Sequence, residues 1–267
     1  MAYKKPQGID DRCSNEPTKC KVRVKSKKSN YYFCCKYLIL CIGSLLLSSC
    51  SHNDGFYPHG EVRNLIERTM MPGGHKEVED YVEWDRCPGW MEPDNKAALL
   101  KYIRDHPNTE DCYLAMVALD LVENHSPGFN KSKLAANRAS RLNDVLVHAH
   151  NPLIRKWANI ARVGDLLYAG DLEGQQKQTQ DILQNIEDYK SEKNPYFIRY
   201  LAILDETPET LEPTLRELLV MGECNHGHLE KALTMAEELR SKFPDFDSHS
   251  IEGNIEALKA GQNPYPM

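Results

Sequence analysis

The feature of this 267-residue sequence that most limits its fold is a series of segments in which apolar residues recur every three or four positions. From residue 61 onward about ten such segments follow one another through short connections containing Pro or Gly, and strand-like alternation is almost absent. The segment opened by Thr109, for example, places Tyr113, Met116, Leu119 and Val122 on one helical face. The sequence therefore predicts an all-α fold.

The same spacing sets the expected helix boundaries. It predicts a helix over residues 62–69 and a less regular one over residues 78–85, on either side of a turn at Met71-Pro72-Gly73-Gly74. Further helices are expected at residues 94–106, 109–126, 130–151, 152–170, 171–186, 195–204, 207–221, 229–242 and 248–260. A pair of such helices cannot bury its apolar stripes alone and needs a neighbouring pair. We therefore expect a right-handed α-solenoid of about five antiparallel helix pairs.

One stretch carries a family resemblance. Gly227-His228-Leu229-Glu230-Lys231-Ala232-Leu233, followed by Ala236, Leu239 and Phe243-Pro244-Asp245, resembles the second half of a tetratricopeptide repeat. In that repeat a Gly closes the first helix, a small Ala lets the second helix approach it, and a Pro ends the unit. The resemblance implies a tetratricopeptide-like (TPR-like) domain over residues 61–267 that binds a protein or peptide. The alternative is a non-repeating helical bundle that contains one such unit.

Charge divides the chain at about residue 50. The first 49 residues hold ten Lys and Arg but three Asp and Glu, a net charge of +7, whereas the remainder carries −13. A basic head before an acidic body is typical of a targeting segment followed by a soluble domain. The acidic body also disfavours nucleic acid as a partner.

The head contains an uncharged run of eleven residues, Tyr37–Leu47, behind several lysines. A membrane-spanning helix needs about 20 apolar residues, so this run favours a signal peptide. The basic stretch from Met1 to Lys36 is longer than bacterial signals usually have. Translation starting near Val22 or Val24 would leave a head of ordinary length.

The run ends in Leu47-Ser48-Ser49-Cys50, which resembles the lipobox of bacterial lipoproteins. The resemblance implies cleavage before Cys50, a diacylglycerol thioether on its sulfur and an acylated amine, with palmitate-type chains that anchor the protein to a membrane. Ser51, where an Asp would favour the inner membrane, implies the outer membrane facing the periplasm. Residues 1–49 are then the signal peptide and residues 50–60 a flexible tether. The alternative is an ordinary thiol after a cleavable signal.

Few residues of the expected mature chain indicate chemistry. The sequence has no nucleotide-binding glycine loop and no nucleophile elbow. Cys87, Cys112 and Cys224 are three in number, so at most one disulfide can form, and Cys112 fits a small buried apolar position. Cys224, His226 and His228 lie close together but lack the spacing of zinc ligands, so we expect neither a metal nor a cofactor.

Two functions follow. The first is a membrane-anchored envelope lipoprotein, distantly similar to outer-membrane assembly lipoproteins, that binds a protein or peptide of the envelope without catalysis; candidate binding residues are Trp90, His226 and His228. The second is a glycan-active or cell-wall-active enzyme on a helical scaffold, in which Trp90 stacks on a sugar beside an acidic residue. Trp157, on a helical stripe, is expected in the core. A closed pocket joining Trp90 to a carboxylate would favour the enzyme.

Overall fold

The computed structural model of the chain describes residues 58, 60–78, 81–86, 88–125, 130–246 and 251–265. The described residues divide into two compact units, one within Met71–Gly89 and one within Gly55–Met70 and Trp90–Met267. The expected signal peptide, Cys50 and most of the expected tether lie outside the described residues.

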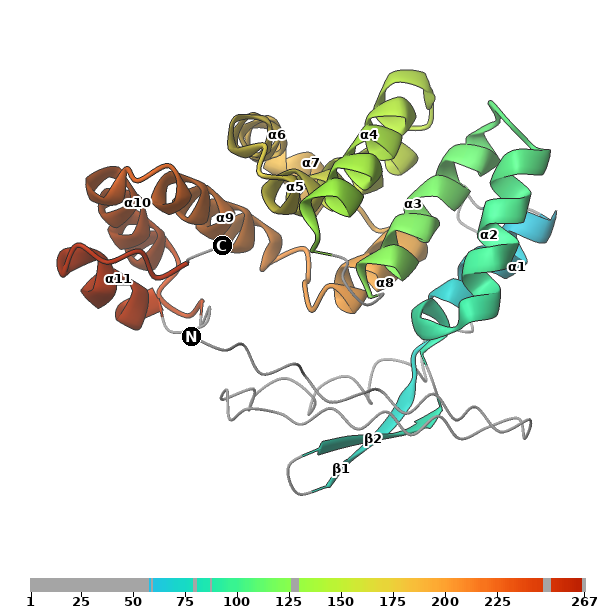
Figure 1. The fold of residues 1–267 in the computed structure, drawn as a ribbon, viewed down its shortest axis with the longest axis horizontal. Helices are drawn as coiled ribbons and strands as arrows, with labels where there is room; N and C mark the ends of the chain where they lie inside the picture. The colour runs from blue at the N-terminus through green and yellow to red at the C-terminus, as the bar shows by residue number, and fades with distance from the viewer. Residues whose placement is uncertain are drawn as a thin grey trace, which may run out of the picture. The chain divides into compact units, whose positions relative to one another are not determined.

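The second unit is helical, as predicted, and the all-α prediction is confirmed for it (Figure 1). Within the described residues its α-helices are α1 (Gly60–Thr69), α2 (Pro93–Asp105), α3 (Glu110–Asn124), α4 (Ser132–His148), α5 (Pro152–Ala169), α6 (Leu172–Gln184), α7 (Ile186–Lys190), α8 (Pro195–Ile203), α9 (Leu211–Asn225), α10 (Leu229–Lys242) and α11 (Ile251–Lys259). A short 3₁₀ helix, η1 (Gly89–Met91), precedes α2.

The helix predicted over residues 78–85 is wrong. In the first unit, β1 (Gly74–Val78) and β2 (Tyr81–Arg86) form a two-stranded antiparallel hairpin, with Val78 opposite Tyr81 and Lys76 opposite Glu83. The β-branched and aromatic residues of this segment favour strands, and two residues separate the strands, which is the length of a tight hairpin connection. At the base of the hairpin the Gly89 amide donates to the Met71 carbonyl at 2.8 Å.

Side-chain caps explain several helix boundaries that the sequence predicted. The Thr109 hydroxyl accepts the Cys112 amide at 3.1 Å, and the Asp171 carboxylate accepts the Gly174 amide at 2.9 Å. The Asn151 side chain accepts the amide of Leu153 at 2.9 Å, at the start of α5. Each cap satisfies a backbone donor that the first helical turn leaves unpaired.

The α5–α6 junction yields a stability prediction. Gly170 closes α5 with a φ of 81°, whereas Gly164 lies inside α5, and an added Cβ would meet no atom within 4 Å at either position. We expect Gly170→Ala to lower the free energy of unfolding by about 1–2 kcal/mol, because an L-residue is strained at positive φ. Gly164→Ala should raise it by about 0.5–1 kcal/mol through helix propensity. Equilibrium urea unfolding followed by circular dichroism checks both, and a loss at both positions would refute the backbone explanation.

Neighbouring helices pack in succession through the helical unit. The pairs α2 and α3, α4 and α5, and α9 and α10 lie side by side, and α3 also contacts α5 while α6 contacts α9 (Figure 1). Their buried apolar residues form a main cluster from α1 to the first turns of α9 and a second cluster over α9, α10 and α11. In the second cluster Ala232 and Ala236 are fully buried, which lets α10 approach its neighbours closely.

Trp157 lies in the main cluster, as predicted. It is 1% exposed, and its ring meets Tyr200 of α8 edge to face, with centroids 5.0 Å apart. Aromatic pairs of this geometry contribute about 0.5–1.5 kcal/mol beyond their buried area. Among the described residues, no helix has the length and apolar character required to cross a membrane.

Candidate functional site

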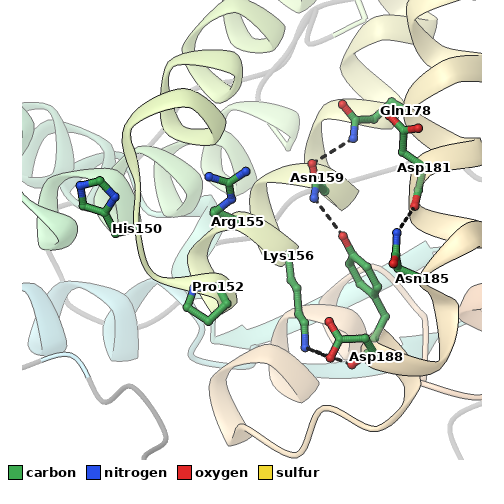
Figure 2. A pocket seen from close by; sticks show the side chains of 10 residues that line it. His150, Pro152, Arg155, Lys156, Asn159, Gln178, Asp181, Asn185 and Asp188 are labelled. Atoms are coloured by element: carbon green, nitrogen blue, oxygen red, sulfur yellow. Dashed lines mark hydrogen bonds and ion pairs between the residues drawn. The ribbon is translucent and has the colours of Figure 1, made fainter.

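A polar groove lies between α5 and the segment formed by α6 and α7. Its volume is about 540 Å³, within the range of pockets that hold small ligands. Figure 2 shows the lining side chains, which are His150, Pro152, Arg155, Lys156, Asn159, Gln178, Asp181, Asn185, Asp188 and Tyr189. A second pocket, of about 100 Å³, lies between α9 and α10.

A row of hydrogen bonds links the helices across the floor of the groove. The Gln178 amide donates to the Asn159 side-chain oxygen at 2.9 Å, and the Asn159 amide donates to the Tyr189 hydroxyl at 2.9 Å (Figure 2). Arg162 extends the row by donating to the Gln178 oxygen at 2.7 Å. Because the bonds fix the amides in one orientation, their remaining hydrogens and lone pairs are held ready for a ligand.

Lys156 lies at the lower end of the groove in Figure 2, where two carboxylates surround its ammonium. Its ammonium lies 3.1 Å from an Asp188 carboxylate oxygen and 3.1 Å from a Glu192 carboxylate oxygen, and it also donates to the Asp188 carbonyl at 3.0 Å. The same ammonium lies 5.9 Å from the centre of the Tyr189 ring. These contacts tie α5 to α7 and fix the width of the groove.

Another wall of the groove begins at the loop between α4 and α5. The Glu110 carboxylate of α3 accepts the His150 amide at 2.7 Å and the Asn151 amide at 3.2 Å, which holds the loop in place. Arg155, one turn into α5, donates to the Ala149 carbonyl at 3.4 Å.

Tyr189 is the most buried polar group of the groove, at 5% exposure. Burial raises the pKa of its hydroxyl, and the Asn159 hydrogen bond lowers it in part. Arg155 lowers the pKa of Tyr189 and Asp181 raises it, so both charges lie within electrostatic range of the hydroxyl. Tyr189 therefore stays neutral and keeps a hydrogen that it can donate to a ligand.

The lining of the groove can form both hydrogen bonds and ion pairs with a ligand. It offers amides, a neutral hydroxyl and charges of both signs. Amide side chains can pair with the N–H and C=O groups of an extended peptide, as strand edges and binding grooves do.

A second cluster of polar residues is buried where α3, α4 and α5 meet. Arg138 of α4 is 3% exposed, and its guanidinium contacts Asp165 of α5 at 2.6 and 2.8 Å. Asp120 of α3 lies farther from Arg138, at 3.6 Å, and accepts the Asn124 amide at 2.9 Å. Arg141 lies 3.6 Å from Asp120.

Electrostatics assign different protonation states to the two aspartates. Burial, together with the nearby Asp165 carboxylate, raises the pKa of Asp120 well above its usual range, and burial also raises the pKa of Asp165. Asp165 takes both short contacts of Arg138 and is therefore the ionised member, whereas Asp120 holds the proton. Perturbed carboxyl groups can mark active sites, but Asp120 and Asp165 are 1% exposed and line neither described pocket. We interpret the cluster as structural.

The structure places the three candidate binding residues outside the groove. Trp90 lies in η1, and its ring centre is 5.6 Å from that of His125. Neither described pocket includes Trp90. His226 follows the last residue of α9 and His228 precedes the first residue of α10, with their ring centres 5.6 Å apart.

The His228 ring is engaged in a local network. Its Nδ1 lies 2.8 Å from a Glu223 carboxylate oxygen, and Lys231 donates to the other oxygen of Glu223 at 2.6 Å. Burial alone raises the pKa of Glu223, but the hydrogen bonds from Lys231 and His228 lower it overall. Within the part of the chain that the structure describes, no group of three or more His, Cys, Asp or Glu residues has a geometry that fits a metal ion.

Two cysteines can be placed. Cys112 is fully buried in α3, which confirms the prediction of a small apolar position, and Cys224 is 2% exposed in α9. Both are free thiols. Burial, with Glu223 next to it, raises the pKa of Cys224 to about 11, so this thiol is unreactive at neutral pH. Cys87 lies outside the described residues.

The groove itself was missed from the sequence. Its side chains come from helices that the spacing predicted, but single-helix patterns give no information on which polar faces meet. One detectable sign was the row of amide residues in α6, whose sequence LEGQQKQTQDILQ is poor in charge for a helix that presents a polar face.

No protein-family model, no curated protein and no solved structure matches this chain. The geometry and charge of the groove are therefore the basis for the functional conclusion.

Proposed function

We propose that this chain is a lipid-anchored lipoprotein of the bacterial envelope that binds a protein or peptide in the groove between α5, α6 and α7. In this proposal the helix pairs of residues 61–267 form a right-handed, TPR-like α-solenoid, and Cys50 carries the lipid. The protein faces the periplasm from the outer membrane. It acts as a scaffold without catalysis.

The observation that carries the proposal is the preorganised row of amides. Gln178, Asn159 and Tyr189 are held in one orientation by hydrogen bonds from two sides of a groove of about 540 Å³. A peptide has regularly spaced donors and acceptors that such a row can satisfy, and preorganisation lowers the entropic cost of binding. The lipobox-like segment Leu47-Ser48-Ser49-Cys50 supports the membrane anchor.

A pull-down from detergent-solubilised envelopes tests the binding function. The tagged full chain should retain a stoichiometric protein partner. Asn185→Trp, which places a large ring at the exposed rim of the groove, should reduce recovery of that partner at least tenfold. Lys133→Trp, at an exposed position of α4 that does not line the groove, is the matched control and should bind normally. Recovery of no partner, or an equal loss in both variants, would overturn the proposal.

The anchor yields a separate prediction. Cys50→Ala removes the sulfur that would carry the lipid, so the chain should move from the membrane pellet to the soluble fraction on cell fractionation. Several acyl chains at about 0.8 kcal/mol per buried CH₂ make the native anchor durable, and the variant lacks all of them. Cys87→Ala should stay in the pellet. Mass spectrometry of the amino terminus completes the measurement, since an unmodified, uncleaved native chain would contradict the anchor.

A further inference from the structure

The charges in the groove are not all neutralised by one another. Lys156, Asp188 and Glu192 form ion pairs among themselves. Arg155, by contrast, has no carboxylate within 4.0 Å among the described residues, and Asp181 has no described cation at that distance. Lys156 is one cation shared by two carboxylates, so that group keeps a net negative charge. Arg155 and Asp181 are the positive and the negative side chain of the groove that have no ion-pair partner among the described residues.

These two charges lie on opposite walls. Arg155 belongs to α5 and Asp181 to α6, and in Figure 2 they stand on either side of Asn159. Both act on the pKa of the buried Tyr189 hydroxyl with opposite sign, which places that hydroxyl within range of each. His150 stands on the same side as Arg155 (Figure 2).

Between the two charges, the floor of the groove is neutral and able to form hydrogen bonds. Tyr189 accepts the Asn159 amide, and no acceptor for its own hydrogen is present among the described residues. Gln178 and Asn159 each use one amide hydrogen in the row, so each retains a second one. The order across the groove is thus a cation, a set of amide and hydroxyl groups, and an anion.

We propose that the groove selects an extended peptide segment that carries one acidic and one basic side chain. The acidic side chain pairs with Arg155, the basic side chain pairs with Asp181, and the peptide backbone between them lies on Asn159, Gln178 and Tyr189. This inference rests on the proposed binding function and names its ligand class. A guanidinium pairs with a carboxylate through two parallel hydrogen bonds, which gives direction as well as affinity.

The charge pattern disfavours other ligand classes. A phosphate-rich ligand would meet the Asp181 and Asp188 carboxylates as well as Arg155, and like charges oppose each other. A neutral sugar would leave Arg155 and Asp181 unmatched. A peptide with both charges satisfies each wall in one bound orientation, so peptide direction is specified as well.

Fluorescence polarisation with the detergent-solubilised full chain tests the ligand class. The probes are acetylated and amidated fluorescent peptides of the form Glu-(Ala)n-Lys and Lys-(Ala)n-Glu, with the number of alanines varied. Matched peptides replace Glu with Gln or Lys with Met. We expect one order and one spacing to bind at least fivefold tighter than either neutralised peptide.

Two groove variants separate the charges. Arg155→Met should remove the preference for Glu over Gln and keep the preference for Lys over Met, while Asp181→Asn should do the reverse. Arg104→Met, at an exposed arginine of α2, is the control and should keep both preferences. Preferences that survive both groove variants, or that Arg104→Met also removes, would overturn the inference.

The outcomes separate this inference from the proposed function. If the pull-down recovers an envelope protein but no charged peptide is preferred, the groove binds a partner by other contacts and the inference fails alone. If the pull-down recovers nothing, the binding function fails and the inference fails with it. Binding of chitotriose, a neutral sugar probe, without binding of any peptide would also overturn the inference.

Discussion

Arg138→Met is expected to lower the free energy of unfolding by about 3–5 kcal/mol at pH 7, because it leaves a buried carboxylate without its cation. Arg138 and Asp165 are 3% and 1% exposed, so water cannot replace the lost contacts at 2.6 and 2.8 Å. Methionine fills much of the space of the arginine stem, so the loss reports the charge more than a cavity. Chemical denaturation at constant pH measures it.

Two controls isolate that charge effect. Arg104→Met removes an arginine whose side chain is 73% exposed and should change stability by less than about 0.5 kcal/mol. In an Asp165→Asn background, Arg138→Met should lower the free energy of unfolding by clearly less than in the native chain, because no unpaired carboxylate remains at position 165. Equal costs in the two backgrounds would mean that the ion pair is not the cause.

Asp120→Asn is expected to stabilise the chain increasingly as the pH rises. Burial raises the pKa of Asp120 in the folded chain above the unfolded value of about 3.9. At any pH between these two pKa values, folding is therefore accompanied by the uptake of a proton at Asp120. The stability that this group contributes is complete below the unfolded pKa and is lost as the pH rises towards the folded pKa. Asparagine, which keeps a donor and an acceptor at the same place, avoids that loss.

The expected size follows from linkage. The difference in stability between variant and native chain should grow by about 1.4 kcal/mol per pH unit across that window, and the two should be similar near pH 4. Glu123, Glu212 and Glu223, whose pKa values are lowered, act in the opposite direction in acid, but they are common to both chains and cancel in the difference. Unfolding curves collected from pH 4 to pH 8 check this. If the variant's free energy of unfolding were lower than that of the native chain by the same amount at every pH, Asp120 would be ionised in the native state.

The helices were predictable because several independent signals agreed at each boundary. Pro152 and Gly170, for example, bound α5 in the sequence and in the structure, and Asn151 caps it. The segment around Val78 and Tyr81 gave a wrong helix prediction, because Val78, Tyr81 and Val82 are separated by three and one positions, a spacing that fits a helical face as well as a pair of strands. Two-residue connections between strands commonly have the sequence Asn-Gly or Asp-Gly, which can be recognised in a sequence, and neither is present there.

The buried ion cluster and the groove were harder to predict, for a shared reason. Asp120 stands between Leu119 and Leu121 in an apolar helix, so its burial could have been inferred, but its partners Arg138 and Asp165 come from two other helices. Periodicity gives the face of each helix and not the identity of the face opposite. The groove depends on how the polar faces of α5, α6 and α7 pack together, and periodicity does not give that arrangement.

Site-specific photo-crosslinking in intact cells tests the central claim, that the groove is where the chain engages its partner. A p-benzoylphenylalanine at Gln184, an exposed position of α6 between the lining residues Asp181 and Asn185 that does not itself line the groove, is compared with one at Leu134, a side chain that is 45% exposed on α4. A discrete cross-linked protein or peptide is expected from position 184 and none from position 134. Cross-links from position 134 alone, or from neither position, would contradict the claim.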